Sequence, residues 1–166
     1  MPRRLLKHIT LKPFKLFVVI ELFSDERFMK EALKEAEKAF VADEVPVGAI
    51  VVCQNRIIAR AHNLTERLND VTAHAEMQAI TAASNYLGAK YLKGCTLFVT
   101  LEPCSMCAGA LFWSQVGKVV FGAADLKRGF IENGGKLHPK TEIVQGILEQ
   151  ECAGLMTEFF KRKRKD

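Results

Sequence analysis

The sequence predicts an α/β fold, in which a mixed central sheet of about five strands, with parallel pairs at its centre, carries helices on both faces. One observation favours this class, and a second indicates a single domain. Segments in which apolar residues recur at helical spacing alternate along the chain with short, mostly apolar runs suited to buried strands. The 166 residues, 49% hydrophobic and 26% charged, also match the length and composition of one globular domain with one core.

The first half of the chain predicts a helix, a β-hairpin and a second helix. Ser24 and Asp25 offer caps for the first helix, in which apolar side chains recur at helical spacing among Lys and Glu. Pro46 ends the turn that follows, and Gly88 is placed to stop the Ala-rich second helix. The expected elements are, in order, a helix over 28–40, hairpin strands over 47–53 and 57–61, a loop over 64–72 and a helix over 73–86.

The second half predicts two more buried strands and two more helices. Pro103 breaks an apolar run, and helical spacing resumes directly after it. The expected elements are a strand over 95–101, a helix over 105–113, a strand over 118–122, a surface loop over 123–139 and a last amphipathic helix over 147–163. Since no repeat or linker divides residues 24–166, we expect a single domain there, preceded by an N-terminal extension over 1–23.

The distribution of charge and the number of cysteines limit which binding partners and which cell compartment the sequence favours. Five Lys or Arg lie in residues 1–15 and five in 161–166, and together they outweigh the formal net charge of +5, so the body between them is net acidic. Such basic ends suit a polyanion or an acidic membrane surface, or serve solubility alone. Five cysteines cannot all pair within one chain, which favours a reducing, cytoplasmic compartment. The apolar run over 16–23 is too short to span a membrane.

The residues best suited to chemistry stand at the starts of two expected helices. His74 and Glu76 open the second helix, and Cys104 and Cys107 open the third. In open α/β sheets, sites form beyond the strand ends, where helix N-termini point their unpaired N–H groups. Cys-x-x-Cys spacing lets both sulfurs reach one ion, and an imidazole completes the three-ligand set of catalytic zinc, with a fourth position for water. Glu76 is the candidate base for that water, provided that it shares the first helical turn with His74.

Each half of this pattern also has a simpler interpretation. A lone His-x-Glu is common, and a lone Cys-x-x-Cys occurs in redox dithiols and structural zinc knuckles. A structural zinc needs a fourth protein ligand, and no remaining His or Cys has the tight spacing of such sites. Cys53, Cys95 and Cys152 are interpreted as small core residues. His-x-Glu followed by Pro-Cys-x-x-Cys is far more specific, because it is the signature of zinc-dependent nucleobase deaminases.

Two motifs resemble the bacterial tRNA-specific adenosine deaminases of the TadA type, in the cytidine and deoxycytidylate deaminase superfamily. The motifs are Thr72-Ala73-His74-Ala75-Glu76-Met77 and Thr100-Leu101-Glu102-Pro103-Cys104-Ser105-Met106-Cys107-Ala108-Gly109-Ala110. The likeness runs from about Asp25 to Lys165. It includes Val45-Pro46-Val47-Gly48-Ala49, Asn63, Val119-Val120-Phe121-Gly122-Ala123, Asp125, Gly146-Ile147-Leu148, Glu151-Cys152 and Phe159-Phe160.

This resemblance implies a cytidine-deaminase-like three-layer sandwich, a homodimer, and hydrolysis of adenosine to inosine at the wobble position of a tRNA anticodon, usually that of an arginine tRNA. It implies one zinc ion (Zn2+) per subunit on His74, Cys104 and Cys107, with Glu76 as the proton carrier. The RNA-binding residues that it implies are Asn63 on the flipped nucleotide, Pro46 and Val47 in the walls of the base pocket, Asp125 at the ribose or flanking backbone, and Phe160, Lys161, Arg162 and Arg164 at the end of the last helix.

Three features depart from the family pattern. Ala124 precedes Asp125 where relatives often have a polar residue, so one contact to a flanking nucleotide is in doubt. The loop over 126–140 differs from that of the best-known members. Residues 1–23 have no counterpart, and we interpret them as an over-long gene model or a flexible arm.

Two other functions remain open at this point. A deaminase of free bases or nucleosides, of the guanine or cytosine type, would share the metal signature but has no use for a basic terminal helix. A zinc-stabilised RNA-binding module without chemistry would not need Glu76. The Phe159 and Phe160 pair with its basic tail suits single-stranded RNA, where cations follow the backbone and aromatic rings stack on bases; we expect one of the two rings to be core.

Overall fold

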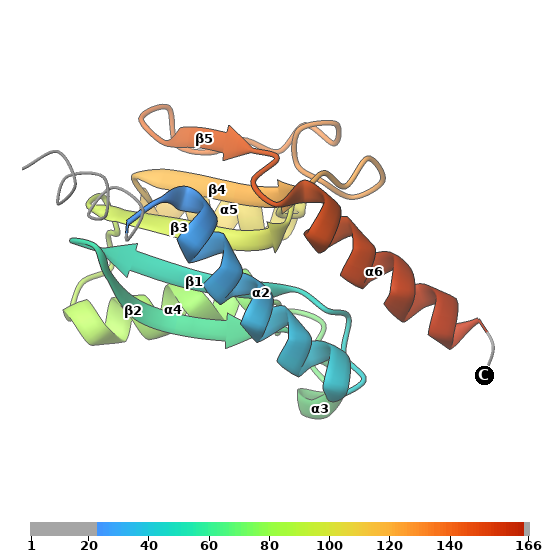
Figure 1. Ribbon diagram of the computed structural model, residues 1–166. Helices are drawn as coiled ribbons and strands as arrows, with labels where there is room; N and C mark the ends of the chain where they lie inside the picture. The colour runs from blue at the N-terminus through green and yellow to red at the C-terminus, as the bar shows by residue number, and fades with distance from the viewer. Residues whose placement is uncertain (1–22, 165–166) are drawn as a thin grey trace, which may run out of the picture.

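The computed structural model describes residues 23–164 of the chain (Figure 1). Our interpretation of residues 1–23 therefore falls almost entirely outside the described residues. The elements are α2 (Asp25–Val41), β1 (Gly48–Cys53), β2 (Arg56–His62), α3 (Thr65–Leu68), α4 (Ala75–Leu87), β3 (Cys95–Leu101), α5 (Ser105–Ser114), β4 (Lys118–Ala123), β5 (Glu142–Gln145) and α6 (Glu149–Lys163).

The five strands form one mixed sheet in the order β2-β1-β3-β4-β5. β1 is antiparallel to both β2 and β3, whereas β3, β4 and β5 run parallel. The predicted α/β class with a mixed five-stranded sheet is confirmed. Parallel pairing occupies only one side of the central strand β3, because the hairpin of β1 and β2 supplies antiparallel strands on the other side.

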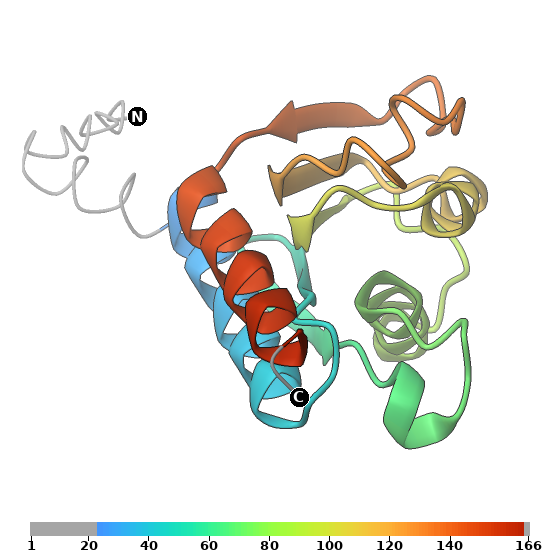
Figure 2. The same ribbon diagram turned by 90° about the vertical axis from the view of Figure 1, so that its right-hand side faces the viewer.

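Helices cover both faces of the sheet, with α2 and α6 on one and α4 and α5 on the other (Figure 2). Alternate residues of β3 serve the two faces, as the pleat of a strand requires. Phe98 stacks on Phe28 of α2 with ring centroids 5.3 Å apart. Leu97 and Val99 belong instead to the cluster that contains Leu111 of α5. The sheet therefore separates two apolar cores, and each holds a pair of helices in place.

α2 crosses the sheet so closely that one position of β1 admits no side chain. A Cβ added at Gly48 would lie 2.1 Å from the backbone oxygen of Ala32 and 2.3 Å from the backbone nitrogen of Ala36. β1 therefore requires glycine at this position, and Pro46 and Val47 lie directly before it in the chain.

Two elements differ from the prediction. The expected loop over 64–72 contains the short helix α3, whose first backbone N–H groups are bound by the buried carboxylate of Glu44. The edge strand β5 was not among the segments predicted as strands, because its four residues are largely exposed and have no apolar run. Within the described part of the chain, no helix is both long and apolar enough to cross a membrane.

Candidate metal centre

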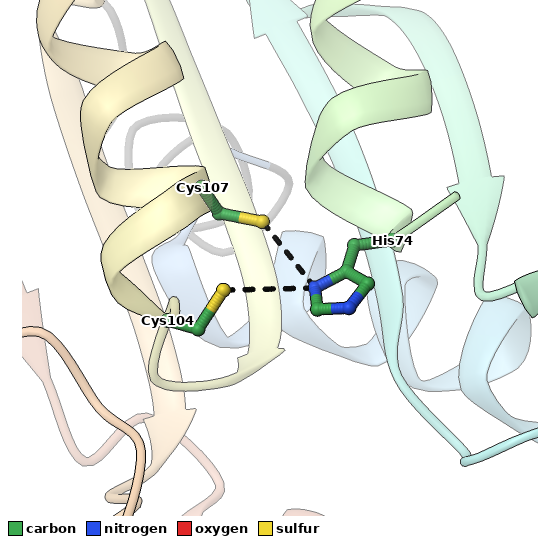
Figure 3. Close-up of side chains that lie close together, drawn as sticks. All are labelled: His74, Cys104 and Cys107. Carbon is green, nitrogen blue, oxygen red and sulfur yellow. Dashed lines mark hydrogen bonds between the residues drawn. The ribbon is translucent and has the colours of Figure 1, made fainter. Parts of the chain in front are cut away.

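His74 and Cys104 occupy equivalent positions in two neighbouring helices. Each is the N-cap residue of its helix, α4 for His74 and α5 for Cys104, with extended backbone and no side-chain hydrogen bond that caps the helix. Their side chains are thus free to point away from the helix ends. Cys107 lies in the first turn of α5, and Figure 3 shows all three side chains converging between the two helix ends.

The three side chains are close enough to share one ion. Nδ1 of His74 lies 3.7 Å from Sγ of Cys104 and 3.5 Å from Sγ of Cys107, and the three ligand atoms lie within 4.8 Å of one another. Tetrahedral zinc, with bonds of about 2.3 Å to sulfur and about 2.05 Å to nitrogen, separates such atoms by roughly 3.6 Å. Among the described residues, no other cluster of three or more His, Cys, Asp or Glu side chains could hold a metal. The donor set fits zinc with three protein ligands.

Hydrogen bonds within the cluster favour one thiolate. The hydrogen bond with Cys107, together with that to His74, lowers the pKa of the Cys104 thiol to about 3. The same hydrogen bond between the cysteines, together with burial, raises the pKa of Cys107. Hydrogen bonding with Cys104 raises the pKa of His74, while burial and the positive charge of Arg128 oppose this rise. Cys104 is therefore the thiol most ready to bind a cation.

Glu76 lies beside the cluster and is shielded from solvent. It is the second residue of α4 and only 4% exposed. Burial raises the pKa of its carboxyl group. His74 and Glu76 therefore both stand at the entrance of one helix, as the proposed chemistry requires, and a carboxyl group with a raised pKa is better suited to hold and pass on a proton than an ordinary one.

Asn63, Pro46 and Val47 form the rim of the site on the side next to α4. Oδ1 of Asn63 accepts the backbone N–H of Ala75 at 2.9 Å. The backbone N–H of Asn63 donates to the backbone oxygen of Val47 at 3.1 Å. Pro46 and Val47 are buried. Three of the residues assigned to the base pocket therefore lie together next to the metal cluster.

Asp125 lies on the opposite rim, in the loop after β4. Its Oδ1 accepts the backbone N–H groups of Lys127 and Arg128, both at 3.0 Å. Ala124 is exposed. One carboxylate oxygen of Asp125 is thus engaged in shaping its own loop, and the charge of Arg128 from the same loop reaches His74.

The residues at the end of α6 that were assigned to RNA binding differ in exposure and in their contacts within the protein. Phe159 is buried and Phe160 is 43% exposed, so one ring of the pair is core, as expected. Arg162 contacts other residues of the protein: its guanidinium lies 4.4 Å from the ring centroid of Phe40 and 3.0 Å from Oδ1 of Asp43. Lys161 and Arg164 are exposed. A surface pocket beside this helix end is lined by Ala42, Asp43, Val45, Glu66, Arg67, Phe159, Phe160 and Lys163.

Sequence reasoning assigned no role to two buried glutamates, of which one holds α3 and the other holds the loop that contains Asp125. Glu44 is fully buried and accepts hydrogen bonds from Thr65, Glu66 and Arg67. Glu102 is 4% exposed and binds the Asp125 loop. In the sequence each is only an acidic residue close to a buried strand or a proline. That pattern does not distinguish a buried carboxylate from one that is exposed to solvent.

Comparisons with known proteins agree with this arrangement. A family model described as the cytidine and deoxycytidylate deaminase zinc-binding region matches residues 23–123. The chain is 50% identical over 147 residues to the tRNA-specific adenosine deaminase of Bacillus subtilis, covering 85% of this chain and 91% of that protein.

Two solved structures extend the comparison to three dimensions. One, from work on A-to-I editing by tRNA:A34 deaminases at the wobble position of transfer RNA, has a TM-score of 0.73 at 41% identity, over 78% of this chain and 98% of that one. Another, guanine deaminase from Bacillus subtilis, has a TM-score of 0.59 at 35% identity, over 67% of this chain and 68% of that one.

Proposed function

The chain belongs to the cytidine and deoxycytidylate deaminase family, and from that membership we propose that it hydrolyses adenosine to inosine at the wobble position of a tRNA anticodon. The observation that carries the proposal is the convergence of His74, Cys104 and Cys107 beside the buried carboxyl group of Glu76. The similarity to tRNA-specific adenosine deaminases supports the choice of substrate. An arginine tRNA is the substrate that we expect.

His74, Cys104 and Cys107 would hold one zinc ion per subunit. When bound, the ion supplies a water molecule of lowered pKa as the nucleophile. Two thiolate ligands cancel the charge of the ion and leave this water less acidic than three neutral ligands would, so a base is needed close by.

Glu76 is that base. Its carboxylate accepts a proton from the water as the new bond to C6 of the adenine forms, and delivers a proton to N1 of the ring. A second proton passes to the 6-amino group, which leaves as ammonia when the C6–N bond breaks, and C6 keeps the oxygen of the water as the carbonyl of inosine. The raised pKa of Glu76 suits it to both directions of transfer.

The rim residues would hold and orient the flipped nucleotide. Among the described residues, the only side-chain hydrogen bond of Asn63 is the one that its Oδ1 accepts, so its NH2 group is available to donate to the nucleotide. Pro46 and Val47 supply apolar walls for an unstacked base. Asp125 would meet the ribose or the flanking backbone with its remaining acceptor capacity.

The end of α6 would lie along the RNA. Phe160 offers a partly exposed ring for stacking, and Lys161 and Arg164 offer exposed charges for phosphates. Arg162 would contribute through its charge while held against Phe40 and Asp43. We place the enzyme in the cytoplasm as a homodimer, with residues 24–166 as a single deaminase domain.

The experiment is a comparison of substrates with zinc-loaded protein. An anticodon stem-loop with adenosine at the wobble position is compared with the same stem-loop carrying that adenosine one position away, and with free adenosine, guanine and cytosine. We expect inosine, detected by mass spectrometry, only in the first RNA, and none with the Glu76→Gln variant. Ammonia released from guanine or cytosine without inosine in the RNA would favour a free-base deaminase. RNA binding without turnover of any substrate would favour the non-catalytic module.

A further inference from the structure

Glu102 is a buried carboxylate that the proposed chemistry does not use. It lies between the end of β3 and Cys104, and its side chain is turned toward the loop after β4. Oε2 accepts the backbone N–H of Asp125 at 3.0 Å, and Oε1 accepts the backbone N–H of Ile131 at 2.9 Å. One side chain therefore binds both ends of the segment 125–131.

The segment between these two hydrogen bonds closes on itself. The backbone oxygen of Asp125 accepts the N–H of Gly129 at 2.8 Å, while its carboxylate accepts those of Lys127 and Arg128. Leu126, Lys127 and Arg128 are exposed at the tip. Hydrogen bonds to Glu102 and Asp125 thus hold a tight turn that presents two cations to solvent.

This turn is docked against the start of α5. The backbone N–H of Phe130 donates to the oxygen of Pro103 at 2.9 Å, and Gly129 forms an isolated antiparallel bridge with Cys104. A Cβ at Gly129 would lie 2.2 Å from Cδ of Glu102 and 2.4 Å from both of its oxygens. A methyl group at position 129 would therefore displace the carboxylate of Glu102 from its two N–H donors, and the two residues interlock next to a proposed metal ligand.

From this interlock we propose that Glu102 is a positioning residue, which holds the turn 125–131 against Cys104 so that Asp125, Lys127 and Arg128 meet the RNA backbone that flanks the target base. The proposal rests on the proposed function, since it needs an RNA substrate. Gly129, which directly follows Arg128, bridges to Cys104, and this contact places the turn beside a proposed metal ligand.

The alternative is that Glu102 contributes only to stability. The two roles differ in what they do to substrate binding. A loop that meets flanking nucleotides affects the KM and RNA affinity more than the kcat, whereas a role in stability lowers the yield of folded enzyme without changing the KM of the part that is folded and loaded with zinc.

The test breaks the interlock from both sides. Glu102→Gln supplies an acceptor for only one of the two N–H groups and faces the other with a donor. Gly129→Ala drives a methyl group into an intact carboxylate. We expect each variant to raise the KM for the stem-loop roughly tenfold, with a smaller change in kcat, and to weaken RNA binding by a similar factor. Glu31→Ala, which removes two surface ion pairs, one with Lys34 and one with Arg60, is the control and should leave the KM and the RNA affinity unchanged.

The double variant Glu102→Ala, Gly129→Ala sharpens the test. Without the carboxylate there is room for the methyl group, so the double variant should be no worse than Glu102→Ala alone, whereas Gly129→Ala is harmful by itself. Zinc content and thermal unfolding are measured for every variant, and kinetic values refer to folded, zinc-loaded enzyme.

The outcomes separate the inference from the proposed function. Wild-type enzyme that neither binds the stem-loop nor forms inosine would overturn the proposed function and this role with it. Wild-type enzyme that forms inosine, with Glu102→Gln and Gly129→Ala retaining the wild-type KM and RNA affinity, would overturn the role of Glu102 alone. Additive effects in the double variant would show that the two residues do not act through their contact.

Discussion

Asn63 caps the helix that His74 begins. Oδ1 of Asn63 accepts the first N–H of α4, that of Ala75, at 2.9 Å, while His74 occupies the N-cap position without making a side-chain cap. The polar group that satisfies the helix end thus comes from the end of the β-hairpin. The imidazole of His74 is released from capping and can turn toward Cys104 and Cys107.

Asn63 therefore has a structural role and a proposed substrate role, and two substitutions separate them. Asn63→Asp keeps an acceptor for Ala75 but loses the NH2 donor, so we expect near-native thermal stability with a large loss of kcat/KM on the stem-loop. Asn63→Ala loses both and should also lower the free energy of unfolding by about 1 kcal/mol. Equal activity in Asn63→Asp and wild type would contradict a donor role for the side chain.

Glu76 should make stability depend on pH. Burial raises the pKa of its carboxyl group above the usual 4.5, so the folded state holds the proton more tightly than the unfolded state does. The resulting stabilisation is complete below that usual value and is lost as the pH rises through the folded-state pKa. After zinc has been removed by a chelator, Glu76→Gln should unfold at a higher temperature than wild type at pH 8, and the difference should shrink toward pH 4. A constant difference across this range would argue against a desolvated carboxylate.

Zinc affinity should rise with pH. Binding needs a neutral His74 and two thiolates, yet the pKa of His74 and the pKa of Cys107 are both raised, and only Cys104, at about 3, is deprotonated in advance. Competition with a chelator between pH 5.5 and 8 should show protons released on binding. Cys104→Ser should lower zinc content and stability together, while Cys152→Ser, a buried cysteine outside the cluster, should leave zinc content unchanged.

The cations at the end of α6 should act in two different ways. Lys161 and Arg164 are exposed, so the double substitution Lys161→Ala, Arg164→Ala should weaken stem-loop binding and reduce the slope of log affinity against log salt by roughly 0.7 for each phosphate that is no longer neutralised. Arg162 is held by Phe40 and Asp43, so Arg162→Ala should lower the thermal unfolding temperature as well. An unchanged salt slope in the double variant would make the tail a solubility device.

Gly48 should tolerate no larger residue. Gly48→Ala places a methyl group against the backbone of α2 and should cost about 1–3 kcal/mol or more in the free energy of unfolding, because neither backbone can yield easily. Gly94→Ala is the matched control, since a Cβ there meets nothing within 4 Å. Chemical denaturation measures both, and similar stability of the two variants would contradict the close crossing of α2 over β1.

The sequence predicted the elements whose signal is local. Apolar periodicity located the helices around Ala32 and Ala79 and the buried strand around Phe98, because one face of each must leave water. It did not reveal α3 or β5. The first N–H groups of α3 depend on Glu44, some twenty positions earlier, and β5 is held by backbone hydrogen bonds to β4 with little apolar burial.

For the site, the sequence by itself determined which groups could do chemistry. His74, Glu76, Cys104 and Cys107 stand out because few other functions need an imidazole, a carboxylate and two sulfurs at these spacings. Only the tertiary structure decided how they meet: the packing of α4 beside α5 brings the two helix starts together, and Asn63 and Glu102 hold the rims through backbone N–H groups. These N–H contacts join residues from 12 to 29 positions apart, and no local pattern encodes them, because every residue except proline carries the same N–H donor.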